Sequence, residues 1–344
     1  MKTYYGASMS ITVVNTLPEN DWRQFVMGNP AGNIFHTPEM FQVFSRTKGY
    51  RPELWAATEN NRVLALFLPV QITLMNGVMR HFTTRSVAFG SVLCAPEAEG
   101  YQALDRLLQT YVRDLDRTPL FTELRNLSDM EALQGVLSKH GFIYEDYLNY
   151  LIKLRLPPED LLQNIGRRTR KHIRRGMRQG KIVVEEAKDS AQVAVCYDLL
   201  CRTYKAAQLP LAHRSLFEAA YDLLWPNNMV RFSLARLEAT PVAVSIDLLY
   251  KDVIYGWYGG LDRAFSSYFP NELLHWHILE WGAENGYAVY DFGGAGKPDE
   301  EYGVRDFKAK FGGELVCYGR NTCVHAKSRL SLSMLGYRYL QKWL

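Results

Sequence analysis

Two stretches of the chain repeat one order of hydrophobic patterns. In the first, YQALDRLLQTYVRDLD at 101–116, the apolar residues fall on one face of a helix. They are Leu104, Leu107, Leu108, Tyr111 and Leu115. The strand-like segment LFTELRN follows, and a glycine then leads into the extended segment HGFIYEDYLNYLIKL. This pattern predicts a helix followed by two strands.

The second stretch begins with NELLHWHILEWGAENGY at 271–287. Asn271 can cap the start of a helix, Leu274, Ile278 and Trp281 share one of its faces, and Asn285-Gly286 can end it. The strand-like AVYDFGG comes next, and KFGGELVCYGRNTCV again places a glycine turn before a β-prone run. The same order of elements therefore occurs twice, which indicates an internal duplication.

Further strand candidates precede each helix. They are RVLALFLPVQIT and HFTTRSVAFGSVL in the first half, and VRFSLARL, PVAVSIDLLY and VIYGWYGG in the second. In each half, several strands come first, then a helix, and then a closing strand. This order predicts an α+β fold of two domains, each a mixed sheet flanked by helices. We expect a first domain at 1–160, a basic connecting helix at 161–181, a second domain at 182–325 and a C-terminal amphipathic helix at 326–344.

The length and composition of the chain indicate its class of protein and its cellular compartment. A length of 344 residues suits two domains, and 47% hydrophobic with 22% charged residues is typical of a soluble globular protein. Five scattered cysteines without a CxxC motif indicate a reducing compartment. The start of the chain lacks the apolar core of a signal peptide, and no segment has the roughly 20 apolar residues of a membrane span. We therefore expect a cytoplasmic protein.

No metal site is expected. His275 and His277 are two apart on the predicted helix, so they point in nearly opposite directions and are more typical of packing and surface positions. The formal net charge is only +4, so a polyanionic partner would have to meet a local basic patch.

One segment provides such a patch. NIGRRTRKHIRRGMRQGK at 164–181 has eight lysines and arginines within about four helical turns. Ile165, Ile173 and Met177 form a stripe that can pack on the protein while the basic side chains face outward. The segment is either a solvated connecting helix or a binding site for the phosphates of RNA, a nucleotide diphosphate or a lipid diphosphate. The candidate binding residues are Arg167, Arg170, Lys171, Arg174 and Arg178.

A second candidate site lies at YDFGGAGKPDEEYGVRDFKAKFGGE, 290–314. Asp291 ends a strand, the glycines allow a tight turn close to a ligand, and Lys308 stands between two phenylalanines. The FKAKF pattern predicts a strand on which Lys308 and Lys310 share a face. Asp291, Glu300 and Glu301 are candidates for a general base, although carboxylates beside glycine turns are more often structural.

Most of the chain resembles the Fem-type aminoacyltransferases, within the broader BioF2-like acyltransferases. The resemblance rests on NIFHTPEM, GRRTRKHIRRGMRQGK, the segment from PVAVSIDLLY to FPNELLHW, and YDFGG followed by DFKAKFGG. It implies two tandem GNAT-like domains that transfer an amino acid from aminoacyl-tRNA to an amine of a peptidoglycan-precursor stem peptide or a similar acceptor. No other cofactor is implied, and we expect a monomer.

The resemblance also implies roles for individual residues. The family's Phe-Lys pair matches Phe307 and Lys308, and the lysine would stabilise the oxyanion of the tetrahedral intermediate. His36 and Arg214 fall where relatives contact the acceptor, and Asp291 and Tyr258 are further substrate-binding candidates. The chain lacks the coiled-coil arm of some relatives, and the resemblance therefore favours a UDP-linked rather than a lipid-linked muropeptide as acceptor. The amphipathic tail is compatible with contact with a membrane surface.

Two other functions compete with this one. A coenzyme-A-dependent GNAT N-acyltransferase would need a glycine-rich loop and free amides at a helix start to hold the pyrophosphate. Here Phe269 and Pro270 occupy that region, and proline lacks the amide donor. A non-catalytic RNA-binding protein would account for the basic helix, although no recognised RNA-binding motif is present.

Overall fold

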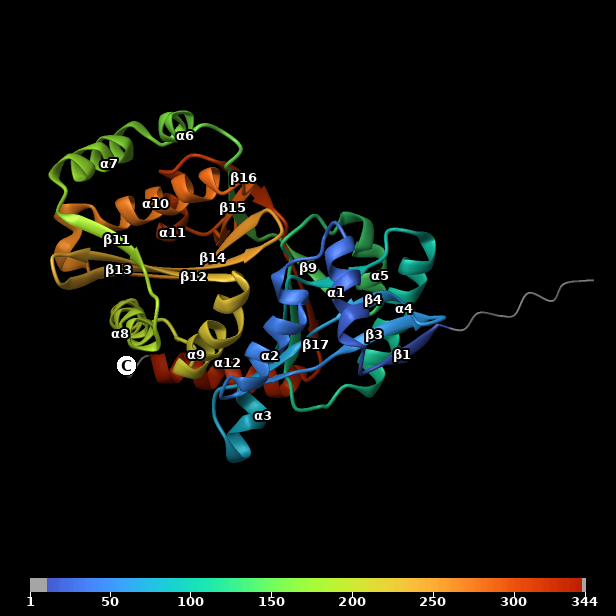
Figure 1. Cartoon of the computed structure of the whole chain (residues 1–344). Helices are drawn as coiled ribbons and strands as arrows, with labels where there is room; N and C mark the ends of the chain where they lie inside the picture. Colours follow the sequence, from blue (N-terminus) through green and yellow to red (C-terminus); the bar gives the residue numbers. More distant parts are fainter. Residues whose placement is uncertain (1–10, 342–344) are drawn as a thin grey trace, which may run out of the picture. The chain divides into compact units, whose positions relative to one another are not determined.

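The computed structural model describes residues 11–341 (Figure 1). It divides into two compact units. The first combines the segment ending at Ser45 with Gly49–Glu145 and the segment that starts at Gly319, and the second combines Arg46–Lys48 with Asp146–Tyr318. The start of the chain, where we expected no signal-peptide core, and the end of the expected C-terminal helix lie partly outside the described residues.

The first unit contains two sheets. One has the strand order β1-β3-β4-β7, formed by Thr12–Val14, Trp55–Glu59, Arg62–Phe67 and Val92–Cys94. The other has the order β2-β5-β6-β8-β17-β9, formed by Tyr50–Pro52, Val70–Thr73, Thr84–Phe89, Phe121–Arg125, Arg320–Val324 and Ile143–Glu145. The pair β6 and β8 is parallel and the other pairs are antiparallel, so this second sheet is mixed as expected.

Helices surround these sheets. The predicted helix at 101–116 is α4, which spans Ala98–Asp114 and packs its apolar stripe on β3 and β4. Leu104, Leu107, Leu108 and Tyr111 are fully buried there, so this prediction is confirmed. The other helical segments are α1 (Glu19–Gly28), η1 (Ile34–His36), α2 (Pro38–Arg46), η2 (Gly77–Met79), α3 (Arg80–Thr83), η3 (Glu131–Leu133), α5 (Gln134–Lys139) and α12 (Lys327–Gln341).

The second unit is built on one seven-stranded sheet with the order β11-β12-β13-β14-β15-β10-β16. Its strands are Ile182–Glu186, Val230–Leu237, Thr240–Tyr250, Val253–Leu261, Val289–Gly294, Leu148–Lys153 and Glu314–Cys317. The pair β14 and β15 is parallel and the remaining pairs are antiparallel. The sheet is mixed, in agreement with the α+β prediction.

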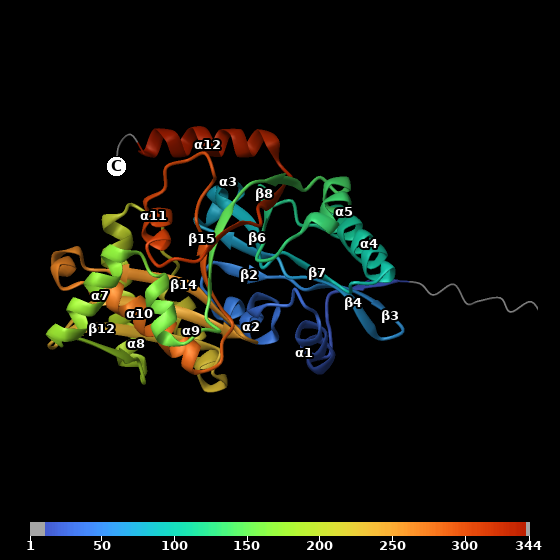
Figure 2. The same ribbon diagram turned by 90° about the horizontal axis from the view of Figure 1, so that it is seen from above.

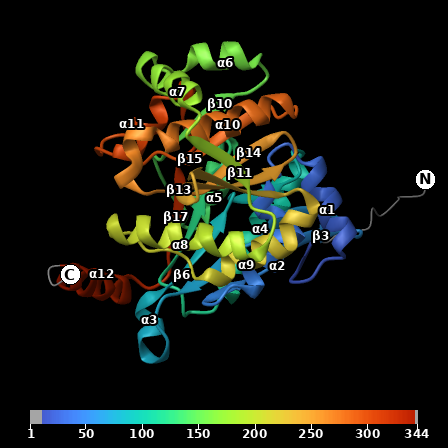
Figure 3. The same cartoon turned by 60° about the vertical axis from the view of Figure 1, so that its left-hand side comes forward.

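Helices cover both faces of this sheet, as Figures 1 and 3 show. On one face lie α10 (Pro270–Glu284), which packs on β12 and β13, and α7 (Arg167–Gln179), which packs on α10. On the other face, α8 (Ser190–Ala206) packs on β13 and β14 beside α9 (Arg214–Leu224). The remaining helical segments are α6 (Pro158–Asn164), η4 (Trp225–Asn227), η5 (Arg263–Tyr268) and α11 (Gly303–Ala309).

The chain passes from the first unit to the second between β9 and β10 and returns between β16 and β17. The expected domain boundaries did not include these crossings. The segment HGFIYEDYLNYLIKL forms β9 in the sheet of the first unit and β10 in the sheet of the second. The segment KFGGELVCYGRNTCV forms β16 in the second and β17 in the first. The first unit therefore contains residues from both ends of the described chain, and the second unit begins before residue 160.

The basic segment forms two helices, and its packing differs from the predicted stripe. Thr169, Ile173 and Gly176 are the buried residues of α7, whereas the side chain of Met177 is 53% exposed. A Cβ atom on Gly176 would lie 2.6 Å from a methyl of Leu273, so the glycine lets α7 approach α10 closely. Met177 is thereby turned toward solvent. Among the described residues, no helix is long and apolar enough to cross a membrane.

Candidate active site

Strands β14 and β15 diverge in the middle of the second sheet. They pair only where Val253–Tyr255 faces Val289–Asp291. Beyond this point β14 continues to Leu261 and β15 to Gly294 without pairing to each other. Because neighbouring strands in a sheet normally share backbone hydrogen bonds, the divergence opens a wedge in which the backbone groups of the two strands can face a ligand.

A cavity of about 720 Å³ occupies this wedge. Its walls come from both strands, from α8, and from the starts of α10 and α11. Aromatic and glycine residues dominate the lining. The residues used below are Tyr204, Tyr258, His275, Phe292, Gly294, Tyr302, Phe307 and Lys308. The size and the mixture of apolar walls with a few polar groups are those of a small-molecule site.

The end of β15 turns around the carboxylate of Asp291. Gly293 has φ +71°, a conformation that favours glycine, and its N–H donates to Asp291 Oδ1 at 2.7 Å. Asn149 Nδ2 donates to the same oxygen at 3.4 Å. Asp291 is buried, and burial raises its pKa to about 6, although these hydrogen bonds and Lys308 oppose the rise. Asp291 therefore forms the turn that the sequence indicated.

The turn directs three carbonyls at one ammonium group. Lys308 Nζ donates to the carbonyl oxygens of Phe292, Gly293 and Gly294 at 2.5, 3.1 and 2.8 Å. An ammonium group has three hydrogens, so every donor of Lys308 is used. Burial lowers the pKa of Lys308 to about 8, while the nearby Asp291 carboxylate acts in the opposite direction.

The predicted FKAKF strand is wrong, because these residues end the helix α11. In a helix, residues two apart point about 200° apart. Lys308 is consequently buried, with 7% of its surface exposed, while Lys310 follows the helix end and is exposed. The segment GVRDFKA has no strong helix signal of its own, and α11 is only seven residues long.

Aromatic rings pack against one another beside Lys308. The ring of His275 stacks on Phe292 with centroids 5.3 Å apart and meets Phe307 edge to face at 5.3 Å. Burial lowers the pKa of His275 to about 4, so the ring is neutral near pH 7. Its Nδ1 lies 2.9 Å from the carbonyl oxygen of Asn271, which can only accept, and the hydrogen is therefore on Nδ1. Nε2 keeps its lone pair.

Sequence reasoning did not select His275 as a cavity residue. The only signal was a polar residue within the apolar run LLHWHILEW, which is also typical of simple packing. Tyr204 and Tyr302 were missed as well, because they belong to segments far apart in the sequence that only the fold brings to one cavity.

The predicted site residues separate into two groups. Phe307, Lys308 and Tyr258 line the cavity, and Asp291 lies within the turn at its edge. Arg214 does not line the cavity. This residue is the first of α9, and its Nε forms an ion pair of 2.8 Å with Glu218. His36 belongs to the first unit, where it is buried and its Nδ1 accepts from Asn33 N–H in the cap of η1.

The predicted polyanion-binding residues lie together on α7. Arg167, Arg170, Lys171, Arg174 and Arg178 all line a surface groove of about 550 Å³, together with Leu162 and Met177. Arg170 Nη1 donates to the backbone oxygen of Gln163 at 2.6 Å, which fixes its position at one end. The groove presents five cationic side chains on one face of the helix, an arrangement that can hold several phosphates.

The start of α10 is poorly suited to a pyrophosphate. Phe269 caps the helix in a left-handed conformation with φ +59°, and the first helical residue is Pro270, which lacks an amide hydrogen. Glu272 adds a negative charge in the first turn, 3.5 Å from His172 Nδ1. The ring of His172 also stacks on Phe269 with centroids 4.2 Å apart. Together these groups obstruct the amides that normally bind an anion at a helix start.

Comparison with known proteins agrees with this architecture. The family described as acetyltransferase (GNAT) domain matches residues 164–308. The crystal structure of FemX is similar over 93% of this chain and 99% of that chain, with a TM-score of 0.71 and 15% identity. No curated protein matches the chain.

Two other solved structures are similar. The C-terminal domain (DUF2156) of a putative lysylphosphatidylglycerol synthetase from Agrobacterium fabrum has a TM-score of 0.58 and 15% identity over 91% of this chain and 94% of that one. A tandem GNAT protein from the clavulanic acid biosynthesis pathway has a TM-score of 0.57 and 8% identity over 92% and 99%. The expected tandem GNAT-like, Fem-type fold is confirmed. The chain has the fold of tandem GNAT proteins, and its residues 164–308 match the acetyltransferase (GNAT) domain family.

Proposed function

We propose that the protein transfers an amino acid from aminoacyl-tRNA to an amine of a peptidoglycan-precursor stem peptide or a similar acceptor. The acceptor nitrogen attacks the ester carbonyl, an amide bond forms, and the ester bond to the terminal ribose breaks. The proton lost by the amine ends on the ribose oxygen. The observation that carries the donor assignment is the groove of α7 with its five cationic side chains, which suits an RNA backbone. The fold shared with FemX and with a putative lysylphosphatidylglycerol synthetase also supports an aminoacyl group.

Lys308 is the proposed oxyanion stabiliser. Its bonds to Phe292 and Gly293 are buried, whereas the bond to Gly294 is only partly buried. The ester carbonyl oxygen of the donor would replace Gly294 on the ammonium, so the other two bonds would keep Lys308 in place. A cation in a water-poor cavity stabilises an oxyanion more than a neutral carbonyl, and one such donor contributes about 3 kcal/mol to the transition state.

A coenzyme-A-dependent N-acyltransferase is the second candidate. The matching family is described as an acetyltransferase domain, which favours it. The start of α10 opposes it, because Pro270 supplies no amide and Glu272 repels a pyrophosphate. An aminoacyl-tRNA places no pyrophosphate there and is therefore the better fit.

The remaining assignments complete the proposal. The acceptor is a UDP-linked or lipid-linked muropeptide, and the protein acts as a monomer in the cytoplasm or at the membrane surface. Acceptor contacts by His36, Arg214, Asp291 and Tyr258 remain predictions. Of these, Tyr258 has the most direct support, because it lines the cavity with Lys308.

Donor consumption tests the proposal. The purified protein is incubated with a pool of charged tRNAs and, separately, with acetyl-coenzyme A, each with and without a UDP-linked muropeptide. We expect acceptor-dependent loss of one aminoacyl-tRNA and no loss of acetyl-coenzyme A. Acceptor-dependent loss of acetyl-coenzyme A alone would establish the second candidate instead. Binding of tRNA without loss of either donor would favour the RNA-binding protein.

A further inference from the structure

An exposed apolar tip connects β5 and β6 in the first unit. Residues 74–81, LMNGVMRH, are all exposed, and half of them are large and apolar. Leu74 is 67% exposed, Met75 50%, Val78 79% and Met79 45%. Figures 1 and 3 show that α3, in the connection between β5 and β6, projects away from the sheet. Four neighbouring apolar side chains at this exposure are unusual on a soluble surface and indicate a docking site.

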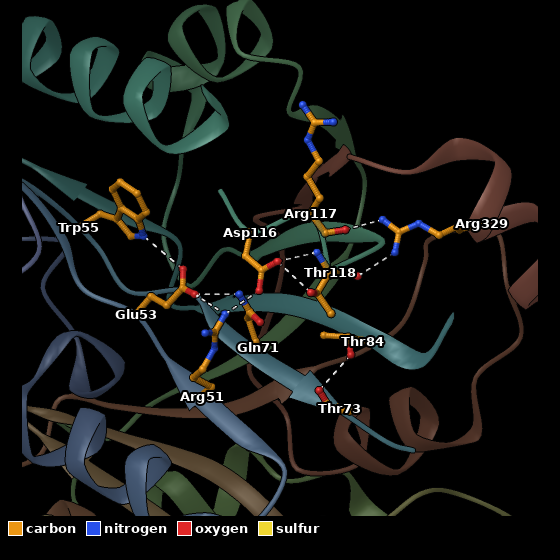
Figure 4. A network of polar contacts seen from close by, with 10 residues as sticks. All are labelled: Arg51, Glu53, Trp55, Gln71, Thr73, Thr84, Asp116, Arg117, Thr118 and Arg329. Atoms are coloured by element: carbon orange, nitrogen blue, oxygen red, sulfur yellow. Dashed lines mark hydrogen bonds and ion pairs between the residues drawn. The ribbon is translucent and has the colours of Figure 1, made fainter. Parts of the chain in front are cut away.

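The base of the tip is firmly held. Thr73 Oγ1 and Thr84 Oγ1 are hydrogen-bonded at 2.9 Å where the two strands leave the sheet (Figure 4). Thr83 Oγ1 donates to the carbonyl of Met79 at 2.9 Å and accepts from the N–H of Met75 at 3.2 Å. These hydrogen bonds anchor the backbone of the tip to the sheet, while its apolar side chains are exposed to solvent.

Helix α12 lies beside the tip, as Figure 2 also shows. Arg329 Nη1 donates to the carbonyl of His81 at 3.1 Å. Arg329 also donates to the carbonyls of Thr118, through Nη1 at 3.2 Å, and of Arg117, through Nη2 (Figure 4). Ser333 Oγ donates to the carbonyl of Phe82 at 2.7 Å. Two leucines of the same helix, Leu332 and Leu335, are 60% and 54% exposed. The helix adds a second apolar strip to the same unit.

The two segments that carry these apolar groups contain basic residues but no acidic ones. The sequence contains no aspartate or glutamate from Val70 to Pro96 or from Tyr318 to Leu344. Arg80 and Lys327 are exposed within these segments. The carboxylate near Arg329 is that of Asp116, and it is paired with Arg51 at 3.0 Å (Figure 4). Two segments that combine exposed apolar side chains with basic residues, and that contain no acidic residue of their own, are complementary to an anionic membrane surface.

We propose that the tip, residues 74–81, and the exposed leucines of α12, Leu332 and Leu335, bind the surface of a bilayer that contains anionic phospholipid. The apolar side chains enter the boundary between headgroups and acyl chains, and Arg80 and Lys327 lie at the level of the phosphates. This inference is independent of the donor and acceptor proposed above.

Flotation of the full chain with vesicles tests the inference. The vesicles contain either 30% dioleoylphosphatidylglycerol in dioleoylphosphatidylcholine or dioleoylphosphatidylcholine alone. We expect binding to the anionic vesicles that weakens at high salt. Val78→Ser combined with Met79→Ser should reduce the partition coefficient at least about tenfold, because less apolar surface is buried. Arg80→Gln and Lys327→Gln should each reduce it about fivefold on anionic vesicles only.

Ile143→Ser is the matched control. Ile143 is 65% exposed and lies in β9, the edge strand that β8 and β17 separate from the β5–β6 pair, so this substitution should leave the partition coefficient unchanged. All substituted side chains are exposed, and equal thermal unfolding would verify that the variants fold. Absence of wild-type binding at low salt would overturn the proposal. Equal vesicle binding by the Val78/Met79 variant and by the control would overturn it as well. A wild-type protein that binds no vesicles but forms a dimer, which the Val78/Met79 substitutions dissociate, would also overturn it.

Discussion

The carboxylate of Asp291 accepts a hydrogen bond of 2.7 Å from the backbone N–H of Gly293. This bond turns the end of β15 so that consecutive carbonyls converge instead of pointing to alternate sides of the strand. Lys308 fills the resulting cage of three carbonyl oxygens. The position of the ammonium in the cavity therefore depends on a buried carboxylate and on a residue that tolerates a positive φ.

Gly293→Ala should weaken this cage. Gly293 has φ +71°, and a Cβ atom there would lie 3.3 Å from the carbonyl oxygen of Gly256. We expect a loss of about 1–2 kcal/mol in the free energy of unfolding, because alanine is disfavoured in the left-handed region. Urea denaturation measures this change.

Gly303→Ala serves as the comparison for that experiment. A Cβ atom added to Gly303 would meet no other atom within 4 Å, and this glycine begins α11 without a positive φ. The free energy of unfolding of this variant should stay within about 0.5 kcal/mol of the wild type or rise slightly. If both variants lost the same amount, the special role of the Gly293 turn would be refuted.

Lys308 should titrate well below ordinary lysines. Its pKa is lowered to about 8 by burial, so the ammonium is charged below this pH and loses its charge above it. NMR titration of ¹³C-labelled lysine side chains, with the signal assigned by Lys308→Met, should show one midpoint near 8. Asp291→Asn should lower the midpoint further, because the Asp291 carboxylate raises the pKa of Lys308.

The same shift sets a pH dependence of stability. Between about pH 8 and 10.5 the unfolded chain binds more protons at Lys308 than the folded chain does. The contribution of Lys308 to the free energy of unfolding should therefore rise as the pH increases from about 8 to 10.5, because a buried lysine destabilises the fold less once it is neutral. Lys308→Met should flatten that part of the profile. A lysine midpoint near 10.5 would contradict both expectations.

The groove of α7 should contribute to tRNA binding through two exposed arginines. Arg174→Gln combined with Arg178→Gln removes two charges that line the groove. We expect the slope of log affinity against log salt concentration for bulk tRNA to fall by about 1.4–1.8, since each of the two phosphate contacts contributes about 0.7–0.9. Filter binding across a salt series measures the slope.

The matched control removes two charges from the same helix. Arg168 and Arg175 are exposed but do not line the groove, because their positions on α7 lie on a different face. Arg168→Gln combined with Arg175→Gln should leave the slope close to that of the wild type. Equal losses in the two double variants would mean that net charge, and not the groove, attracts the RNA.

Much of the fold follows from local signals in the sequence. The apolar stripe of α4 and the Asn285-Gly286 end of α10 identified both helices, and the mixed sheets followed from the order of elements. Phe307 and Lys308 were placed by their resemblance to a family motif. The five basic residues of the α7 groove were found because a helical repeat of charges is visible without tertiary information.

Other features depend on tertiary packing and have no local signal. The β-prone runs after each glycine turn predicted strands correctly, but not that β10 and β17 belong to different sheets. FKAKF alternates as a strand does, yet Lys308 lies in the helix α11, where its ammonium group is bound by the carbonyls of β15. The cavity position of His275 likewise depends on the divergence of β14 and β15.

Single-turnover transfer from aminoacyl-tRNA by Lys308→Met and Lys310→Met tests the central claim most directly. Lys308 is held in the cavity wall, while Lys310 is an exposed lysine two residues away. We predict that Lys308→Met slows transfer by about 10²–10³-fold, as expected for loss of one oxyanion donor, and that Lys310→Met transfers at the wild-type rate. Equal rates for a folded Lys308→Met, Lys310→Met and the wild type would contradict the account.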